Sequence, residues 1–209
     1  MTTFFFSLFA FSLLYIAVAS RLLTYIRILI FQGMLLFGIT YLELHEMNWI
    51  NLELILLETI VFKTVLIPYY LSYIIKKNNI VRETEPFVSD IGSIAIVTCL
   101  FVLSFFITDT LQIPEASRIF TIVAFTSVFS GLYIIVSRKK IITHIMGYMI
   151  IENGIFIFSL AIGSEQPLLI NLGILLDIFV SVLVLGMIVN RIGNTFEEMS
   201  IENLANLKD

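Results

Sequence analysis

Seven long runs of apolar residues are the feature that most limits what this chain can fold into. Each run is about twenty residues long, the length that an α-helix needs to cross the hydrocarbon core of a bilayer. Only 13% of the residues are charged, whereas ordinary soluble domains carry about 25%. The sequence therefore predicts an all-α polytopic membrane protein with about seven transmembrane helices. The runs span residues 4–20, 22–42, 51–75, 91–109, 118–137, 141–162 and 167–190.

The positions of the basic residues predict how these helices are oriented. Ten of the twelve lysines and arginines lie near the first, third and fifth connections or after the last run, and so on one side of the membrane. Cytoplasmic loops carry such an excess of positive charge. We therefore expect a multi-pass protein with its N-terminus outside and its C-terminus in the cytoplasm. The ten residues are Arg21, Arg27, Lys76, Lys77, Arg82, Arg138, Lys139, Lys140, Arg191 and Lys208.

An internal repeat relates the two ends of the chain. Three short segments of the first half recur in the same order in the second half, each with a polar or charged position. Four helices separate equivalent positions, so the two copies point the same way across the membrane. We therefore expect two parallel three-helix repeats joined by a connector helix. The matching segments are LYIAVASR (14–21) with LYIIVSR (132–138), QGMLLF (32–37) with NGIFIF (153–158), and ILLE (55–58) with ILLD (174–177).

The repeat divides the chain into four expected parts. Residues 1–76 hold the first three helices, and residues 77–115 hold a loop and the connector helix. Residues 116–192 hold the last three helices, and residues 193–209 form an acidic cytoplasmic tail.

The sequence offers little equipment for covalent chemistry. Its single cysteine, Cys99, lies inside an apolar run, and His45 and His144 are far apart in the sequence. No metal-ligand spacing, phosphate-binding loop or catalytic motif occurs. The net charge of −4 gives no sign of a nucleic-acid surface. We expect no active site, metal or cofactor in this chain.

Four ionisable residues lie well inside the apolar runs: Glu58, Lys63, Glu152 and Asp177. On insertion scales, a charged side chain at the centre of a bilayer costs about 2.5–3.5 kcal/mol. Such residues are therefore expected to face protein or water, and either to pair with one another or to stay neutral.

Glu152 and Asp177 are the strongest candidates for a proton relay. Each lies near the middle of its run, and the short connection between the runs predicts an antiparallel hairpin with both carboxyl groups at similar depth. Burial and a neighbouring carboxylate both favour the protonated form of a carboxyl group. A carboxyl group poised in this way can take up and release a proton.

The helix that carries Glu152 also holds other polar side chains. His144, Tyr148 and Glu152 recur every four residues and share one helix face, and Asn153 lies beside them. This face suits an inward half-channel with His144 at its mouth. His144 and Tyr148 equally suit ordinary anchors at the membrane interface.

The first copy lacks a full set of carboxyl groups. Glu58 is the counterpart of Asp177, but near the position of Glu152 the first copy offers only Gln32. The first copy has Lys63 instead, five residues after Glu58. On a straight α-helix that spacing turns the two side chains about 140° apart, so a pair within the helix is not expected.

Lys63 is therefore expected to face another helix or another subunit. There it would either bias a neighbouring carboxylate or form a static pair that fixes helix packing. Pro68 removes a backbone hydrogen bond and frees the carbonyl of Thr64, so a kink with a polar opening is expected near Lys63.

With these residues identified, the chain resembles hydrogenase-4 component E over nearly its full length. That family comprises membrane subunits of nickel-iron hydrogenase and formate hydrogenlyase complexes, which are relatives of respiratory complex I. The second copy also resembles the three-helix K subunit of complex I, whose membrane carboxylates would correspond to Glu152 and Asp177. Two departures are that Asp177 is shorter than glutamate and that Gln32 cannot titrate. The motifs are FKTVLIP (62–68), GYMIIENG (147–154), LLDIF (175–179) and NLANLKD (203–209).

The resemblance implies a non-catalytic subunit that contributes buried charges to proton translocation coupled to electron transfer. The implied partners are antiporter-like membrane subunits, a membrane anchor subunit, membrane lipid and a peripheral hydrogenase arm. The nickel-iron site and iron–sulfur clusters would belong to that arm. Alternatives are a structural scaffold of the same complex, a K-like subunit of a cation/proton antiporter complex, and a stand-alone transporter.

Overall fold

The computed structural model of the chain is helical wherever its backbone is described, apart from short connections. The described residues are 2–43, 53, 56–77, 87–138 and 141–163, with eight helical positions between 173 and 187. None of these residues forms a strand. Most of the expected last helix, and the whole of the expected tail at 193–209, lie outside the described residues.

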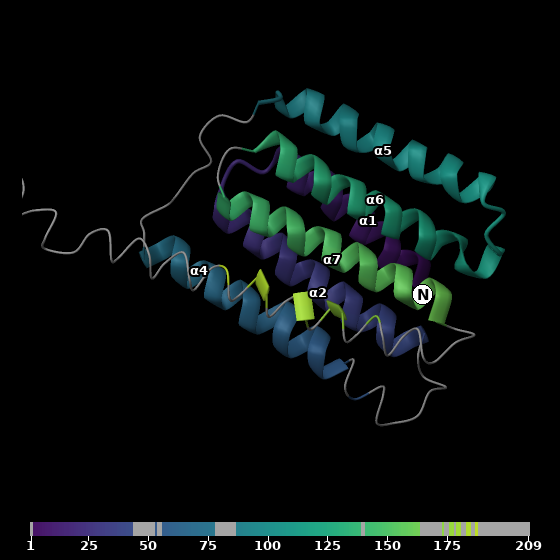
Figure 1. Ribbon diagram of the computed structural model, residues 1–209, viewed down its shortest axis with the longest axis horizontal. Coiled ribbons are helices and arrows are strands. Elements are labelled where there is room, and N and C mark those ends of the chain that lie inside the picture. Colours follow the sequence, from purple (N-terminus) through teal and green to yellow (C-terminus); the bar gives the residue numbers. More distant parts are fainter. Residues whose placement is uncertain are drawn as a thin grey trace, which may run out of the picture.

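Within the described ranges, six α-helices and one π-helical segment form a bundle (Figure 1). Four of the α-helices are long and apolar enough to cross a membrane: α2, α5, α6 and α7. The first helix is apolar but shorter, and the π-helix η1 runs directly into α4. The fold is therefore that of a helical membrane protein, while seven spans remain a prediction. The elements are α1 (Thr2–Val18), α2 (Leu22–Glu43), η1 (Glu58–Leu66), α4 (Ile67–Lys77), α5 (Asp90–Thr110), α6 (Glu115–Ser137) and α7 (Ile141–Gly163).

Local sequence signals explain where α5 and α6 begin and end. Ser89 precedes α5 and its side chain accepts a hydrogen bond from the backbone N–H of Gly92 at 3.2 Å, as expected of an N-cap serine. After α5 the chain turns at Gln112, whose φ of 52° lies in the left-handed region. Pro114 lies directly before α6. A backbone N–H at that position has no partner within the helix, so proline loses nothing there.

The tightest helix pair is α6 with α7, because glycines let the two backbones approach. A Cβ atom on Gly131 would lie 2.6 Å from the carbonyl oxygen of Gly147, and one on Gly154 would lie 2.8 Å from that of Ala124. The hydroxyl of Ser127 also donates to the carbonyl of Ile150 at 2.8 Å. Small residues and side-chain hydrogen bonds of this kind hold helices together in lipid, where the hydrophobic effect gives little help.

Replacing Gly131 with alanine should therefore destabilise the protein. The new methyl group would meet backbone that cannot give way, and overpacking of this kind costs about 1–3 kcal/mol. Gly38→Ala is the matched control, because its Cβ would lie 3.0 Å from the far end of the Phe5 ring, a side chain that can move aside, and not against backbone. Thermal unfolding in mild detergent compares the two variants; equal midpoints for Gly131→Ala and the unmodified protein would contradict the close approach.

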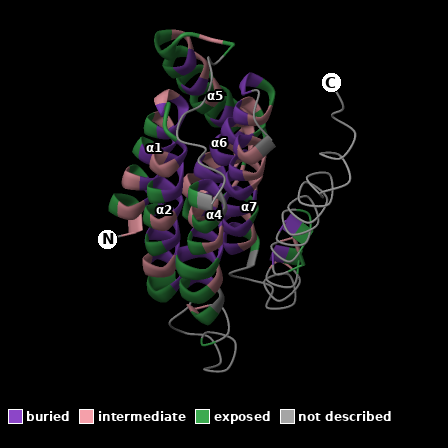
Figure 2. Cartoon of the chain, turned by 90° about the vertical axis from the view of Figure 1, so that its left-hand side faces the viewer, coloured by how far each residue is buried: buried purple, intermediate pink, exposed green. Residues whose placement is uncertain are grey.

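Helices α1 and α2 pack against α6 and α7 within the bundle. The rings of Phe6 on α1 and Phe120 on α6 meet edge to face, with centroids 4.6 Å apart. Contacts also join α2 to α7. Figure 2 shows that buried residues gather on the inward faces of these helices. This arrangement suits two three-helix copies, but the repeat itself stays a prediction.

Helix α5, in the place of the expected connector, lies at the edge of the bundle (Figure 1). Its inward face holds small polar residues, and Ser93 there accepts a hydrogen bond from the hydroxyl of Tyr133 at 2.8 Å. Its outward face is apolar and includes Ile91 and Phe106, which are 83% and 62% exposed. An apolar outward face is what a helix needs where it meets lipid chains.

The expected irregularity before Pro68 takes the form of the π-helix η1. The backbone N–H of Ile67 bonds to the carbonyl of Phe62, and the hydroxyl of Thr64 donates to the carbonyl of Thr59 at 2.9 Å. Proline cannot donate a backbone hydrogen bond, and its ring clashes with the carbonyl four residues earlier. A wider turn that joins residues five apart accommodates this clash, and such turns are frequent at functional sites.

Candidate functional site: a buried ion pair and its polar neighbours

Lys63 is the centre of the candidate site. It lies on η1 and is only 4% exposed, so its charge must be met within the protein. Its ammonium group lies 2.7 Å from a carboxylate oxygen of Asp177, and both side chains are 2% exposed. The structure therefore pairs a lysine of the first half of the chain with an acid of the second half. The sequence left open whether Lys63 faces another helix or another subunit, and in the structure its acidic neighbour belongs to the same chain.

The angle of about 140° expected between Glu58 and Lys63 on a straight α-helix does not apply, because this segment is a π-helix. Both residues lie in the π-helix η1, where hydrogen bonds join residues five apart. The spacing of five therefore places the two residues about one turn apart along the backbone, rather than on opposite sides of the helix. The side chain of Glu58 is outside the described part of the structure.

Asn153 links Lys63 to two further helices. The Lys63 ammonium donates to the side-chain oxygen of Asn153 on α7 at 3.4 Å. The amide nitrogen of Asn153 donates to Gln32 on α2 at 3.1 Å. Gln32 in turn donates to the hydroxyl of Ser12 on α1 at 2.9 Å. A row of buried polar side chains thus crosses the bundle from the ion pair to α1.

An aromatic ring and a small cavity complete the surroundings of Lys63. Its ammonium lies 4.6 Å from the ring centre of Phe156, a distance at which an aromatic face attracts a cation. Lys63 and Asn153 also line an internal cavity of about 10 Å³ beside Pro68. A cavity of that size holds about one water molecule.

Glu152 is buried in α7 directly beside Asn153. It is only 2% exposed, and it lies about 16 Å along the helix from Ile141 at 1.5 Å per residue. Tyr148 lies within electrostatic reach of both Glu152 and Asp177. Glu152 is thus next in sequence to Asn153, which contacts Lys63, and the joint role predicted for the two acids and Tyr148 stays a prediction.

His144 is held by the backbone of Arg138, the residue directly after α6. A ring nitrogen of His144 lies 2.7 Å from the backbone carbonyl oxygen of Arg138. The guanidinium of Arg138 is itself buried and donates to the backbone carbonyl of Ala17 at the end of α1 at 2.7 Å. Lysine or arginine often satisfies the free carbonyls at such helix ends. His144 therefore has a structural partner at the predicted channel mouth.

Sequence reasoning assigned no role to Ser12 and Gln32 in the row of polar side chains, or to Arg138 beside His144. Serine and glutamine in apolar helices are ambiguous, because a side-chain hydrogen bond within one helix can satisfy them. For Arg138 the only signal was its place in a basic cluster, which predicts a loop. Among the described residues, no group of three His, Cys, Asp or Glu side chains could hold a metal ion.

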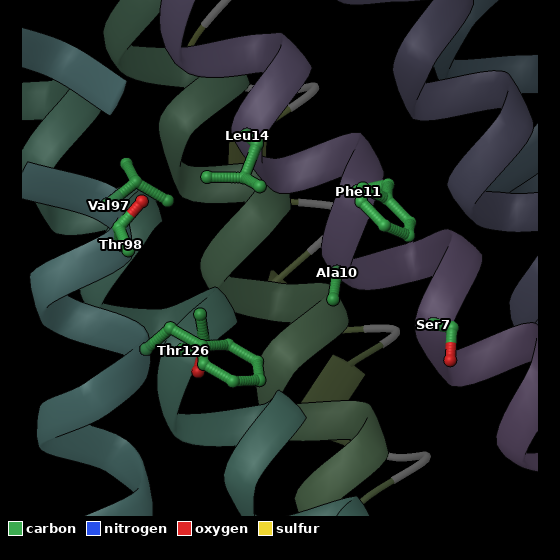
Figure 3. A pocket seen from close by; sticks show the side chains of 8 residues that line it. Ser7, Ala10, Phe11, Leu14, Val97, Thr98 and Thr126 are labelled. Atoms are coloured by element: carbon green, nitrogen blue, oxygen red, sulfur yellow. The ribbon is translucent and has the colours of Figure 1, made fainter. Parts of the chain in front are cut away.

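A second feature is an apolar cavity of about 290 Å³ between α1, α5 and α6 (Figure 3). Figure 3 shows Phe11 and Leu14 of α1 on one side and Val97 of α5 on the other. Hydroxyl groups of Ser7, Thr98 and Thr126 are its polar lining. The cavity offers no charged group, so it is not part of the polar site.

The bundle and the buried pair define a class of protein, a multi-pass helical membrane protein with an ion pair in its interior. Two comparisons name relatives. The chain is 25% identical over 187 residues to the uncharacterized protein Rv0085 of Mycobacterium tuberculosis, covering 88% of this chain and 85% of the relative. It is 27% identical over 150 residues to hydrogenase-4 component E of Escherichia coli and of Shigella flexneri, covering 70% of this chain and 68% of the relatives. No family model and no solved structure matches.

Proposed function

We propose that this chain is a non-catalytic membrane subunit of a complex I-like, membrane-bound hydrogenase-type complex, and that its buried charges take part in proton translocation. Distant homology to hydrogenase-4 component E supports membership of a hydrogenase-type complex. The observation that carries the role in translocation is the Lys63–Asp177 pair at 2.7 Å, with Glu152 buried close by. Cofactors and electron transfer would belong to partner subunits.

The chemistry of the site suits a proton relay. A carboxylate paired with an ammonium stays ionised, and the same carboxylate favours its protonated form when the ammonium moves away. A shift of Lys63 relative to Asp177 would therefore drive proton uptake or release. Asn153 gives the ammonium a second oxygen at 3.4 Å, and the adjoining cavity has room for about one water molecule.

The π-helix supplies a place where such a shift can occur. Its hydrogen bonds join residues five apart, and an α-helical register of the same residues is a neighbouring state. A change of register in η1 would move Lys63 relative to Asp177, which lies on a separate segment. In this proposal, electron transfer in the partner arm is linked to the relay through that movement.

A second function is favoured by the same ion pair. The pair joins the two halves of the chain, so it would also suit a static element that fixes helix packing in a scaffold subunit. A buried pair contributes little net stability, but loss of one partner leaves an uncompensated charge that costs about 3–5 kcal/mol. The scaffold and relay functions differ in what happens when both charges are removed together.

The setting in a complex is tested by purification of the tagged full-length protein from native membranes in mild detergent. We expect antiporter-like subunits, a membrane anchor subunit and a peripheral nickel-iron arm to co-purify, identified by mass spectrometry. Antiporter-like subunits without an arm would instead identify a cation/proton antiporter complex. A protein that purifies alone in several mild detergents would contradict the proposal.

A further inference from the structure

All hydrogen bonds in the row of polar side chains from Lys63 to α1 run the same way, from donor to acceptor away from Lys63. Lys63 donates to Asn153, Asn153 donates to Gln32, and Gln32 donates to Ser12. Ser12 then donates to the backbone carbonyl of Phe9 at 2.6 Å. Every donor along this row points away from Lys63, and every acceptor oxygen points toward it.

The charge of Lys63 dictates that direction. An ammonium group has three donors and no acceptor, so Asn153 must present its side-chain oxygen to it. The amide nitrogen of Asn153 then faces Gln32, which must accept with its own oxygen. Gln32 is left with its amide nitrogen toward Ser12, whose hydroxyl has to donate onward. A reversed amide at either position would set two donors or two acceptors against each other.

We propose that Gln32 and Ser12 are positioning residues for Lys63. They lock the Asn153 amide with its oxygen toward the ammonium and so keep Lys63 charged when Asp177 takes up a proton. This inference rests on the proposed function, because it explains how Lys63 stays positively charged throughout the relay. It also gives Gln32 a role that needs no titration, although Gln32 stands near the position of a carboxyl residue in the other half.

Aligned dipoles are the physical basis of this effect. Hydrogen-bonded groups in series polarise one another, and in a buried site each bond is electrostatically stronger than in water. Ser12, Gln32 and Asn153 are 6%, 0% and 3% exposed, so water does not screen the row. Their oxygens present the negative end of the whole series to Lys63.

Within the described part of the chain, the other charged or titratable residues near Lys63 lie on three segments. Asp177 is in direct contact, and Glu152 and Tyr148 lie on α7, the helix of Asn153. Glu58 shares η1 with Lys63. On α2, Arg27 is exposed on the outer surface, so the side chain that α2 turns toward this site is the neutral Gln32.

The test reads the protonation of Lys63 itself and needs no transport activity. Full-length protein with ¹⁵N-labelled lysine is placed in lipid bilayers, and solid-state NMR follows the side-chain nitrogen of Lys63 with rising pH. Loss of the signal in Lys63→Met assigns it. Gln32→Met, which is similar in volume but apolar, and Ser12→Ala should show the neutral amine at a pH lower than the unmodified protein does. Each variant removes hydrogen bonds between neutral groups and leaves the Lys63–Asn153 bond in place, so the shift should be at most about one pH unit.

Two controls separate positioning from packing. Ser130→Ala removes a buried hydroxyl that has no hydrogen-bond partner in the structure, so it should leave the titration of Lys63 unchanged. Ser12→Thr keeps the hydroxyl, so Lys63 should become neutral at the same pH as in the unmodified protein, unlike in Ser12→Ala.

The possible outcomes point to different conclusions. An unchanged titration in both Gln32→Met and Ser12→Ala would overturn the positioning role and leave the proposed relay to be judged by transport. An equal shift in Ser130→Ala would also overturn it, because any loosening of the bundle would then suffice. A shift confined to Gln32→Met and Ser12→Ala, with rescue by Ser12→Thr, supports it even where translocation itself fails.

Discussion

Glu152→Gln is expected to abolish proton translocation while the protein still folds and assembles. The glutamine side chain would fill almost the same volume in α7 but cannot release a proton. Glu152 is 2% exposed, so a neutral amide at this position should cost less to bury than an ionised carboxylate does. Proton uptake into sealed inverted vesicles should fall by on the order of a hundredfold, the scale on which one positioned proton-transfer group acts.

The matched control for that experiment is Glu115→Gln. Glu115 is the first residue of α6 and is exposed, so the same chemical change is made outside the buried site. Electron transfer and subunit content are measured in the same vesicles. Normal translocation by Glu152→Gln would remove Glu152 from the relay, whereas loss of the whole complex would indicate a structural role.

Removal of one charge of the Lys63–Asp177 pair should have the second large effect. Lys63→Met or Asp177→Asn leaves the other charge buried without its partner, which costs about 3–5 kcal/mol. We expect each single variant to melt at a clearly lower temperature in detergent. The double variant has lost both charges of the pair and should recover most of that stability. The effects of mutations at two residues in direct contact are not expected to add.

Translocation by the double variant decides between relay and scaffold. In a relay, the double variant is stable but does not move protons, because both groups of the relay are gone. In a scaffold, recovery of stability restores translocation as well. Asp109 and Arg118 provide the control pair: they are 2.8 Å apart but 63% and 34% exposed, and neutralising one should cost at most about 1 kcal/mol.

The sequence was sufficient to predict the helices, because hydrocarbon leaves few alternatives. Every backbone polar group in a bilayer must bond within the protein, so runs of apolar residues predict α-helices, and α2, α5, α6 and α7 lie where the runs do. Pro68 predicted the irregularity at Lys63 for a similar reason. That the irregularity is a π-helix depends on how the whole turn accommodates the proline ring. Pro68 alone does not determine this.

The buried charges were also evident from the sequence, but their partners were not. The energetic cost of Lys63, Glu152 and Asp177 in an apolar run requires each to meet protein or water, and the sequence indicated no more than that. The pairing of Lys63 with Asp177 joins residues more than a hundred positions apart. It depends on how η1 packs against the helices of the second half.

The polar row through Gln32 and Ser12 was decided by tertiary structure alone. Each of these side chains is ordinary in its own helix, where a serine or an amide has local partners available. Only the packing of α1 on α2 and of α2 on α7 places them end to end with Asn153. Thus the sequence determined that this is a helical membrane protein with buried charges to be neutralised. The tertiary structure decided which groups neutralise them, because ion pairs and hydrogen bonds require contact within a few ångströms.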